Sequence, residues 1–265
     1  MGMLLAFDLD GTIVTRDRQL PERIRQAILA ARQAGHVVTV ITGRHLKGTQ
    51  AILDALEIDC HYGTCQGARV HGIGTDHHVE LHLEDEVVQE LLTRFGSDPR
   101  AEFFLSTRDT MFVRDPNAQG WAWARGEGQR LVAHGTYAGE RAHKFIVVSE
   151  DAPKVQAELQ ARFPELAYYL WDDRFLEVVA SGGTKGNALA HLAALHSVPR
   201  EETIAFGDGV NDISMLQWAG RAIGVGHLSP GVAEVIDEHI PAPEELGVAH
   251  WLEQHLLAPA LQPTN

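Results

Sequence analysis

The chain has 265 residues, of which 45% are hydrophobic and 22% charged, a composition typical of a globular protein with a substantial core. Its formal net charge is −14 and no basic stripe is present, so we expect no nucleic-acid partner. No apolar run approaches the roughly 20 residues that a membrane helix needs, and the start MGMLLAFDLDGT does not resemble a signal peptide. We therefore expect a cytoplasmic protein without a membrane partner.

The first part of the chain alternates strand and helix patterns. MLLAFDL and HVVTVITGR are apolar runs that end in polar loops, which is typical of buried parallel strands. PERIRQAILAARQAG places apolar residues at helical spacing, and TQAILDALEI predicts a second helix. The repeated strand–helix order predicts a parallel α/β sheet. The expected strands are 3–9 and 36–44, and the expected helices are 21–35 and 49–58.

The middle of the chain mixes strand pairs with helices, which predicts a separate α+β unit over 80–181. The stretch GWAWARGEGQRLVAHGTYAG at 120–139 has no clean period, and we expect it to be irregular. The elements expected in this unit are helices at 84–95 and 152–163, two strands within 101–115, a strand at 143–150 and a hairpin within 167–180.

After SGGTKG the parallel pattern returns. The expected elements are helices at 185–198, 212–220 and 229–237, strands at 203–209 and 221–226, and a frayed tail at 260–265. The chain therefore leaves an α/β domain, builds a second domain and returns to the first.

Polar residues follow the predicted strands of the α/β domain. In open α/β sheets, ligands bind at the carboxyl ends of the strands, so these side chains are expected at one edge. Aspartates from two loops suit Mg²⁺, and a lysine after a glycine-rich turn together with a threonine hydroxyl suits phosphate. GDGVND alone is compatible with a simple turn, but the convergence of the sites favours phosphoryl transfer, in which an aspartate can be the nucleophile. The residues concerned are Asp8, Asp10, Thr42, Lys185, Asp208 and Asp212.

Four segments resemble the motifs of the haloacid dehalogenase superfamily. They are DLDGTIV at 8–14, ITGR at 41–44, the lysine of GGTKGNAL, and GDGVND at 207–212. The insertion between the second and third motifs is similar to a type C2 cap, and the closest group is the Cof-like phosphatases. The resemblance implies a Rossmann-like parallel-sheet core at 1–79 and 182–265, with an α+β cap inserted at 80–181.

The resemblance also implies roles for the residues that match the motifs. Asp8 matches the nucleophile and a Mg²⁺ ligand, and Asp208 matches a further metal ligand. Asp10 matches the general acid and base, and its backbone carbonyl matches a metal ligand. Asp212 supports the acidic loop, and Arg44 either contacts substrate or pairs with a carboxylate. The implied phosphate-binding residues are Leu9, Thr42, Gly43, Lys185 and Asn211.

The implied function is a Mg²⁺-dependent phosphatase that hydrolyses phosphomonoesters of small metabolites, particularly sugar phosphates. A phosphomutase with the same aspartyl-phosphate and a non-catalytic phosphate-binding relative are the alternatives. The chain departs from many Cof-like sequences at Gln66-Gly67 and Gly226-His227, which bears on cap contacts and substrate range rather than on catalysis. The candidate substrate-reading residues in the cap are Arg108, Arg114, Trp121, Trp123, Lys144 and Trp171.

The two cysteines, Cys60 and Cys65, are expected to be reduced thiols, because the nearby histidines match no zinc-ligand spacing. The 15 histidines, densest in HGIGTDHHVELH at 71–82, are expected mainly at the surface.

Overall fold

The computed structural model describes residues 2–72 and 79–257, which form two compact units. Within the described residues, the first unit contains 2–44, 49–72 and 184–257, and the second contains 45–48 and 79–183. The short stretch 45–48 packs with the second unit, because Lys47 Nζ donates to the Gly128 carbonyl at 2.9 Å and Ser106 Oγ lies 3.1 Å from His45 Nδ1.

The first unit contains a parallel sheet with the strand order β14-β13-β12-β1-β2. Strand β1 (Leu4–Phe7) is completely buried and lies between β12 (Thr203–Gly207) and β2 (Val37–Val40). Its apolar character on both faces fits a strand covered by helices on both sides. Because the three strands are parallel and in register, their carboxyl ends meet at one edge. The remaining strands are β13 (Arg221–Val225) and β14 (Glu238–Ile240).

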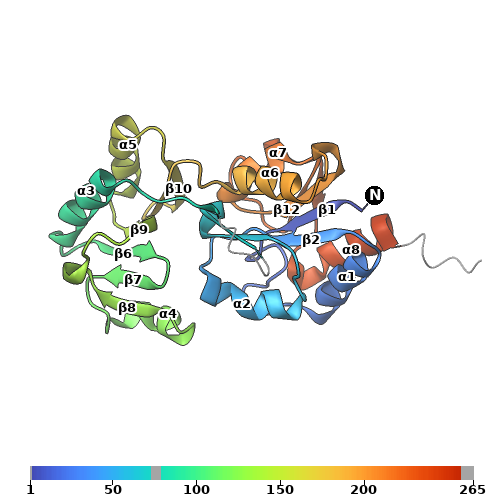
Figure 1. Cartoon of the computed structure of the whole chain (residues 1–265), viewed down its shortest axis with the longest axis horizontal. Coiled ribbons are helices and arrows are strands. Elements are labelled where there is room, and N and C mark those ends of the chain that lie inside the picture. Colours follow the sequence, from blue (N-terminus) through green and yellow to red (C-terminus); the bar gives the residue numbers. More distant parts are fainter. Residues whose placement is uncertain (1, 73–78, 258–265) are drawn as a thin grey trace, which may run out of the picture. The chain divides into compact units, whose positions relative to one another are not determined.

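Helices cover both faces of this sheet (Figure 1). On one face lie α6 (Lys185–Leu195) and α7 (Ile213–Trp218), and on the other lie α1 (Glu22–Gln33) and α8 (Gly247–Leu252). The buried residues of α1 are the apolar stripe seen in its sequence. The unit also contains most of α2 (Leu46–Ala55) and the antiparallel hairpin of β3 (Tyr62–Thr64) and β4 (Arg69–His71).

The second unit contains a sheet with the order β10-β11-β9-β6-β7-β8. Its neighbouring strands are antiparallel, except for the parallel pair β7–β8. The strands are β6 (Glu102–Thr107), β7 (Thr110–Val113), β8 (Arg130–Ala133), β9 (Ala142–Val148), β10 (Ala167–Asp172) and β11 (Phe175–Val179), and the short β5 (Val79–Glu80) precedes them.

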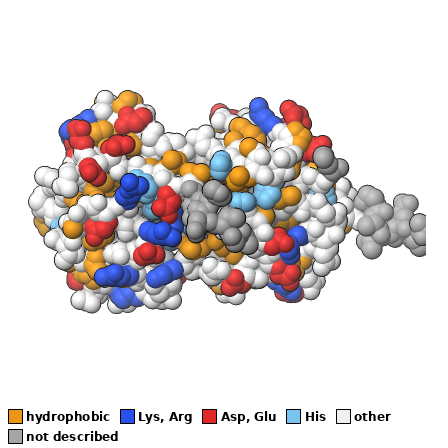
Figure 2. Space-filling model, viewed as in Figure 1, with side chains coloured by type: hydrophobic (Ala, Val, Ile, Leu, Met, Phe, Trp, Pro, Cys, Tyr) orange, Lys and Arg blue, Asp and Glu red, His pale blue; other side chains and the backbone are white. Residues whose placement is uncertain are grey.

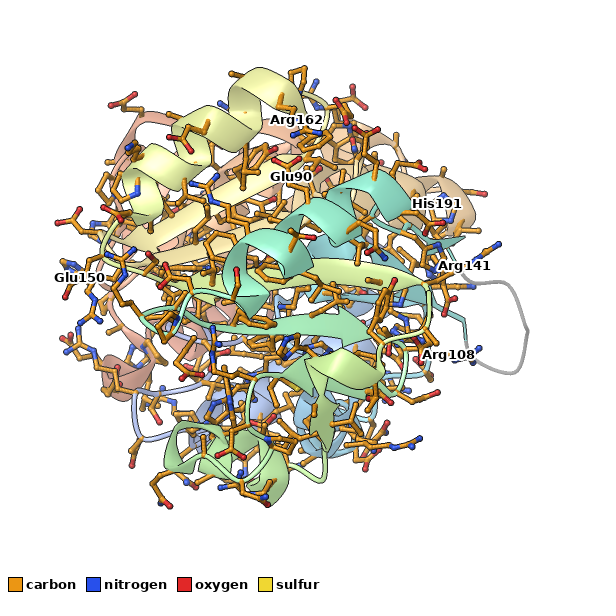
Figure 3. The ribbon with its side chains drawn as sticks, turned by 90° about the vertical axis from the view of Figure 1, so that its left-hand side faces the viewer. Glu90, Arg108, Arg141, Glu150, Arg162 and His191 are labelled. Carbon is orange, nitrogen blue, oxygen red and sulfur yellow. The ribbon has the colours of Figure 1, made fainter. Side chains whose placement is uncertain are left out.

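The two faces of this second sheet are covered differently. Helices α3 (Asp85–Gly96) and α5 (Ala152–Arg162) pack on one face, over stacked Phe103 and Phe145 rings whose centroids lie 5.3 Å apart. Figure 3 shows Glu90 of α3 and Arg162 of α5 pointing toward one another in an ion pair. The opposite face carries a smaller apolar cluster that includes Phe104, Trp121 and the short helix α4 (Ala122–Gly126).

Two stretches differ from the sequence-based expectation. Residues 120–139 contain α4 and β8, and β8 pairs with β7, a long-range contact that leaves no period in the local sequence. The helix expected at 229–237 is wrong, because only a 3-10 turn forms at Val232–Glu234. Gly231 enters the left-handed region with φ +85°, and the Asp237 N–H then donates to the Ala222 carbonyl at 2.8 Å, which leads the chain into β14.

The histidine-rich stretch 71–82 is not wholly at the surface. His71 is buried, and its ring stacks on Tyr62 with centroids 4.9 Å apart, whereas 73–78 lie outside the described residues. The expected tail at 260–265 also lies outside them.

Among the described residues, no helix has the length and apolar character needed to cross a membrane. On the face drawn in Figure 2, acidic and basic side chains are interspersed.

Candidate active site

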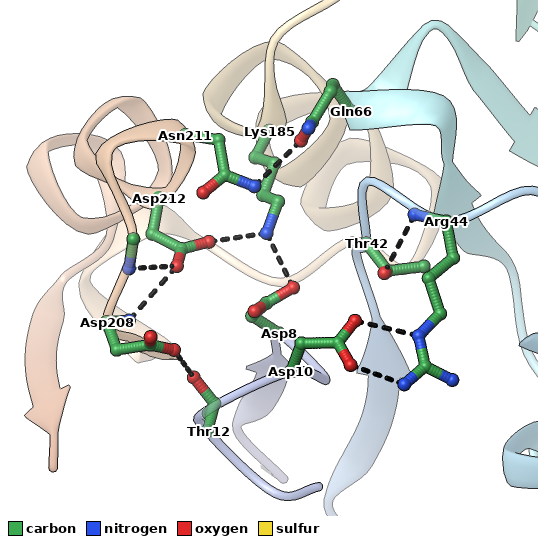
Figure 4. Close-up of polar contacts among 11 residues, drawn as sticks. Asp8, Asp10, Thr12, Thr42, Arg44, Gln66, Lys185, Asp208, Asn211 and Asp212 are labelled. Atoms are coloured by element: carbon green, nitrogen blue, oxygen red, sulfur yellow. Dashed lines mark hydrogen bonds and ion pairs between the residues drawn. The ribbon is translucent and has the colours of Figure 1, made fainter. Parts of the chain in front are cut away.

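The carboxyl ends of β1, β2 and β12 bring polar side chains to one edge of the first sheet (Figure 4). Asp8 directly follows β1, and its N–H still donates to the Phe206 carbonyl of β12 at 3.0 Å. Thr42 follows β2, and Asp208 follows β12. The predicted convergence of these residues is therefore present in the structure.

Lys185 is the completely buried cation of this edge. Its Nζ lies 2.6 Å from Asp8 Oδ1 and 2.6 Å from Asp212 Oδ1. The lysine is the first residue of α6, whose N-terminus is capped by the Thr184 hydroxyl. The start of a helix thus fixes the backbone position from which the ammonium reaches the strand ends.

The acidic loop after β12 is held in shape by its own aspartates. Asp212 Oδ2 accepts hydrogen bonds from the N–H groups of Asp208 and Gly209 at 3.0 and 2.9 Å. Asp208 Oδ1 accepts a hydrogen bond from the Thr12 hydroxyl at 2.7 Å. With Lys185 on its other oxygen, Asp212 acts as the scaffold of the loop, and Asp208 presents its carboxylate to the edge.

Asp10 and Arg44 form a bidentate ion pair beside this buried cluster. Arg44 Nε donates to Asp10 Oδ2 at 2.7 Å, and Nη2 contacts the other carboxylate oxygen. The Arg44 N–H also donates to the Thr42 hydroxyl at 3.1 Å. The Asp10 side chain remains 57% exposed, so a carboxylate of fixed orientation is accessible to solvent.

Gln66, in the loop after β3, adds a further polar side chain to this edge of the sheet. Asn211 Nδ2 donates to Gln66 Oε1 at 2.8 Å, and both side chains are buried. A Cβ at Gly43 would lie only 2.5 Å from Gln66 Nε2, so glycine leaves room for this amide. The Leu9 side chain is buried, which leaves only its backbone to face a ligand.

Comparison with known proteins identifies the family. Residues 5–252 match the family model described as haloacid dehalogenase-like hydrolase. The chain belongs to this family. It is therefore a hydrolase, and the predictions of the family and of an enzyme are confirmed.

Two curated relatives match the hydrolase over almost its whole length. The HMP-PP phosphatase of Yersinia pseudotuberculosis serotype I is 28% identical, and the alignment covers 98% of each chain. The pyridoxal phosphate phosphatase of Escherichia coli K12 is 25% identical, with 96% of this chain and 98% of the relative covered.

Solved structures share the fold of the hydrolase. A haloacid dehalogenase subclass IIB sugar phosphatase superposes with a TM-score of 0.82 at 22% identity, covering 95% of this chain and 98% of the other. A haloacid dehalogenase-like hydrolase from Bacteroides thetaiotaomicron has a TM-score of 0.82 at 23% identity, covering 96% and 99%. The predicted α/β fold class is confirmed by these likenesses.

The electrostatics of the hydrolase site show an excess of negative charge. Burial raises the pKa of the Asp8 carboxyl well above its ordinary value; Lys185 opposes this shift, and the neighbouring aspartates add to it. Burial, followed by the charge of Asp212, raises the pKa of Asp208 to about 7. Burial lowers the pKa of the Lys185 ammonium, but the carboxylates of Asp212 and Asp8 outweigh burial and raise it overall. One ammonium therefore does not neutralise the cluster.

This donor set fits a hard divalent cation. Carboxylate oxygens of Asp8, Asp208 and Asp212 lie within 4.8 Å of one another. Oxygen-only ligands and unneutralised negative charge are what Mg²⁺ selects. Because both oxygens of Asp212 already accept hydrogen bonds, Asp8 and Asp208 are the carboxylates best placed to hold the ion.

The sequence analysis gives two polar residues of this edge no role in catalysis, metal binding or phosphate binding. Thr12 lies inside the quoted DLDGTIV motif, and its hydroxyl orients Asp208. Gln66 was assigned only to cap contacts and substrate range, but its amide holds Asn211 within the first unit. Its left-handed backbone, with φ 63°, turns this side chain inward and cannot be seen in a sequence pattern.

The candidate substrate-reading residues of the second unit have different environments. Arg114 donates to backbone carbonyls of residues 95–101, including Gly96 at 3.0 Å, so it fixes a loop. Trp121 is buried in the small apolar cluster. Lys144 and Trp171 both contact Glu177. Arg108 and Trp123 are exposed.

Proposed function

We propose that the hydrolase is a Mg²⁺-dependent phosphatase that cleaves phosphomonoesters of small metabolites through an aspartyl-phosphate on Asp8. The observation that carries the proposal is the buried Lys185 ammonium between Asp8 and Asp212, with Asp208 beside them. A buried cation close to Asp8 and Asp208, whose carboxyl pKa values are raised, at the carboxyl edge of a parallel sheet, suits a phosphate group and a metal ion.

In the first step, a carboxylate oxygen of Asp8 attacks the phosphorus atom. The bond from phosphorus to the alcohol oxygen breaks, and Asp10, protonated before this step, donates its proton to that oxygen. Arg44 orients Asp10 through the bidentate contact, so the acid is held in one position.

In the second step, water attacks the phosphorus atom of the aspartyl-phosphate. Asp10 takes a proton from this water, the bond between Asp8 and phosphorus breaks, and inorganic phosphate leaves. Asp8 is thereby restored.

The phosphoryl oxygens are held by donors that the sheet edge provides. Lys185 reaches them from the start of α6 and the Thr42 hydroxyl from the end of β2, and Asn211 adds its side-chain amide. Backbone N–H groups of Leu9 and Gly43 complete the set. Mg²⁺ bound by Asp8, Asp208 and the Asp10 carbonyl supplies positive charge that offsets the repulsion between Asp8 and the phosphate.

The names of the relatives support a small phosphorylated metabolite as substrate. They are an HMP-PP phosphatase, a pyridoxal phosphate phosphatase and a sugar phosphatase. We extend this substrate class to the hydrolase and keep sugar phosphates within it. A cytoplasmic location is part of the same proposal, and it is supported by Cys60 and Cys65, neither of which forms a disulfide.

The experiment is phosphate release from a panel containing HMP-PP, pyridoxal phosphate and hexose phosphates, with Mg²⁺ and with EDTA. We expect Mg²⁺-dependent release from at least one compound and none in EDTA. Conversion of a hexose phosphate to its isomer without phosphate release would instead identify a phosphomutase. No turnover of any compound by the folded protein would contradict the proposal.

A further inference from the structure

A second cluster of metal-ligating side chains lies entirely within the second unit. It consists of Glu80 at the end of β5, His82 two residues later, and His143 in β9. One ligand atom from each residue lies within 4.8 Å of the other two. None of the three belongs to the proposed phosphatase site.

The backbone brings the three residues together. The Leu83 N–H donates to the Ala142 carbonyl at 2.7 Å, so the segment after β5 runs beside the start of β9. The His82 and His143 rings consequently lie with centroids 4.9 Å apart, tilted by 30°. Glu80 Oε2 lies 3.8 Å from His82 Nε2.

His143 is oriented as a metal ligand would be. Its Nδ1 lies 2.9 Å from the Leu81 carbonyl, which can only accept a hydrogen bond. Nδ1 therefore carries the proton, and in the neutral ring Nε2 carries the lone pair. A backbone carbonyl that fixes the tautomer and ring plane in this way is a regular partner of metal-binding histidines.

The cluster combines one buried ligand of fixed orientation with two ligands that solvent can reach. His143 is completely buried, whereas the side chains of His82 and Glu80 are 18% and 25% exposed. An ion can therefore reach the cluster from solvent. Tetrahedral zinc ligands lie about 3.4 Å apart, so side-chain rotations that shorten the separations between ligand atoms by at most about 1.4 Å close the set.

We propose that Glu80, His82 and His143 bind one divalent transition-metal ion, of which Zn²⁺ is the type example. Two imidazoles and one carboxylate select Zn²⁺, Co²⁺ or Ni²⁺ over Mg²⁺, which prefers oxygen ligands. Three protein ligands leave a fourth position for water. The ion joins the segment after β5 to β9, so binding stabilises the second unit.

The test is a titration of the full chain, without a histidine tag, with Zn²⁺ against a chromophoric chelator and with Mg²⁺ in large excess to occupy the acidic cluster. We expect one Zn²⁺ per chain, and visible absorption of a tetrahedral type when Co²⁺ replaces Zn²⁺. His82→Ala and Glu80→Gln should each weaken Zn²⁺ binding by at least about tenfold.

His191→Ala is the matched control, because His191 is an exposed histidine on α6 of the first unit. It should bind Zn²⁺ as the wild type does. Zn²⁺ should also raise the melting temperature of the wild type and of His191→Ala, but not of His82→Ala. Absence of tight Zn²⁺ binding by the wild type, or equal binding by His82→Ala, would overturn the proposal.

Discussion

Each unit buries a lysine against carboxylate, and the two arrangements differ in their charge balance. In the second unit, Lys144 Nζ lies 2.8 Å from Glu177 Oε1, and the Trp171 indole N–H donates to the other oxygen at 3.1 Å. This ion pair joins one ammonium to one carboxylate. In the first unit, Lys185 meets two carboxylates, and Asp208 adds a third.

This difference separates a structural pair from a functional cluster. A balanced, hydrogen-bonded pair has no remaining charge to neutralise, and its net contribution to stability is small. In the unbalanced cluster, burial and then the neighbouring carboxylates raise the pKa values of Asp8 and Asp208, and an incoming cation can neutralise the negative charge that remains. Substitutions in the two places should therefore have opposite consequences.

The largest expected effect is on catalysis. Asp8→Asn removes the proposed nucleophile but keeps the shape of the side chain, so kcat should fall by roughly 10⁴-fold or more. Phosphate release measures this loss, and circular dichroism checks that the variant is folded. Asp17→Asn, an exposed aspartate of the same loop region, is the control and should retain activity. Activity of Asp8→Asn within tenfold of the wild type would remove Asp8 from its role.

The next effect is on stability in the second unit. Lys144→Met removes the ammonium that contacts the buried Glu177 carboxylate, which should lower the free energy of unfolding by about 3–5 kcal/mol. Adding Glu177→Leu should restore most of the loss, because both charges are then gone. Denaturant unfolding of the single and double variants measures the difference. Equal instability of both would show that the pair stabilises the sheet by its charges.

The opposite result is expected for Asp208→Asn in the first unit. The folded pKa of Asp208, about 7, lies above its unfolded value of roughly 4. The protonated Asp208 carboxyl therefore makes its full contribution to the free energy of unfolding below pH 4, and this contribution is lost as the pH rises toward 7. In EDTA, Asp208→Asn should become more stable than the wild type across this window, by on the order of 2–4 kcal/mol at pH 7.

Adding Mg²⁺ gives a second test of the difference in stability between the wild type and Asp208→Asn, because the ion neutralises the negative charge of the Asp208 carboxylate. The wild type should recover stability with Mg²⁺ at pH 7, and Asp208→Asn should respond far less. Thermal unfolding at pH 5 and pH 7, with Mg²⁺ or EDTA, provides the measurement. A variant less stable than the wild type in EDTA at pH 7 would contradict the charge imbalance.

The smallest expected effect concerns Arg44. Arg44→Lys cannot make the bidentate contact to Asp10, so kcat should fall about 5–10-fold through poorer orientation of the acid. Arg25→Lys is a matched control, because Arg25 makes the same two-pronged contact to Glu22 on the exposed side of α1. If both variants turn over substrate equally fast, Arg44 has no role in positioning Asp10.

The strand ends of the first unit could be placed from sequence because their signal is local. Apolar runs that stop at Asp8, Thr42 and Asp208 predict buried parallel strands, and parallel strands bring their ends together. The sequence alone could not decide whether Arg44 contacts substrate or pairs with a carboxylate. The contact between Arg44 and Asp10 depends on how the loops after β1 and β2 lie against each other.

Elements without a local signal were missed. Strand β8 exists because it pairs with β7, and its half-exposed residues show no alternation. The helix expected at 229–237 was wrong, because Gly231 has a positive φ in the left-handed region. The Glu80–His82–His143 cluster could not be read from the sequence either, since it joins residues about 60 positions apart through β9.

The central claim is that Asp8 carries the phosphoryl group, and acid-quenched mass spectrometry tests it most directly. With p-nitrophenyl phosphate, whose leaving group needs no proton, Asp10→Asn lacks only the base that activates water in the second step, so the intermediate should accumulate during turnover with Mg²⁺. We predict that the peptide containing Asp8 gains the mass of one phosphoryl group, and that the Asp8→Asn/Asp10→Asn double variant gains none. A phosphorylated peptide elsewhere in the chain, or no phosphorylated peptide while phosphate is released, would contradict the account.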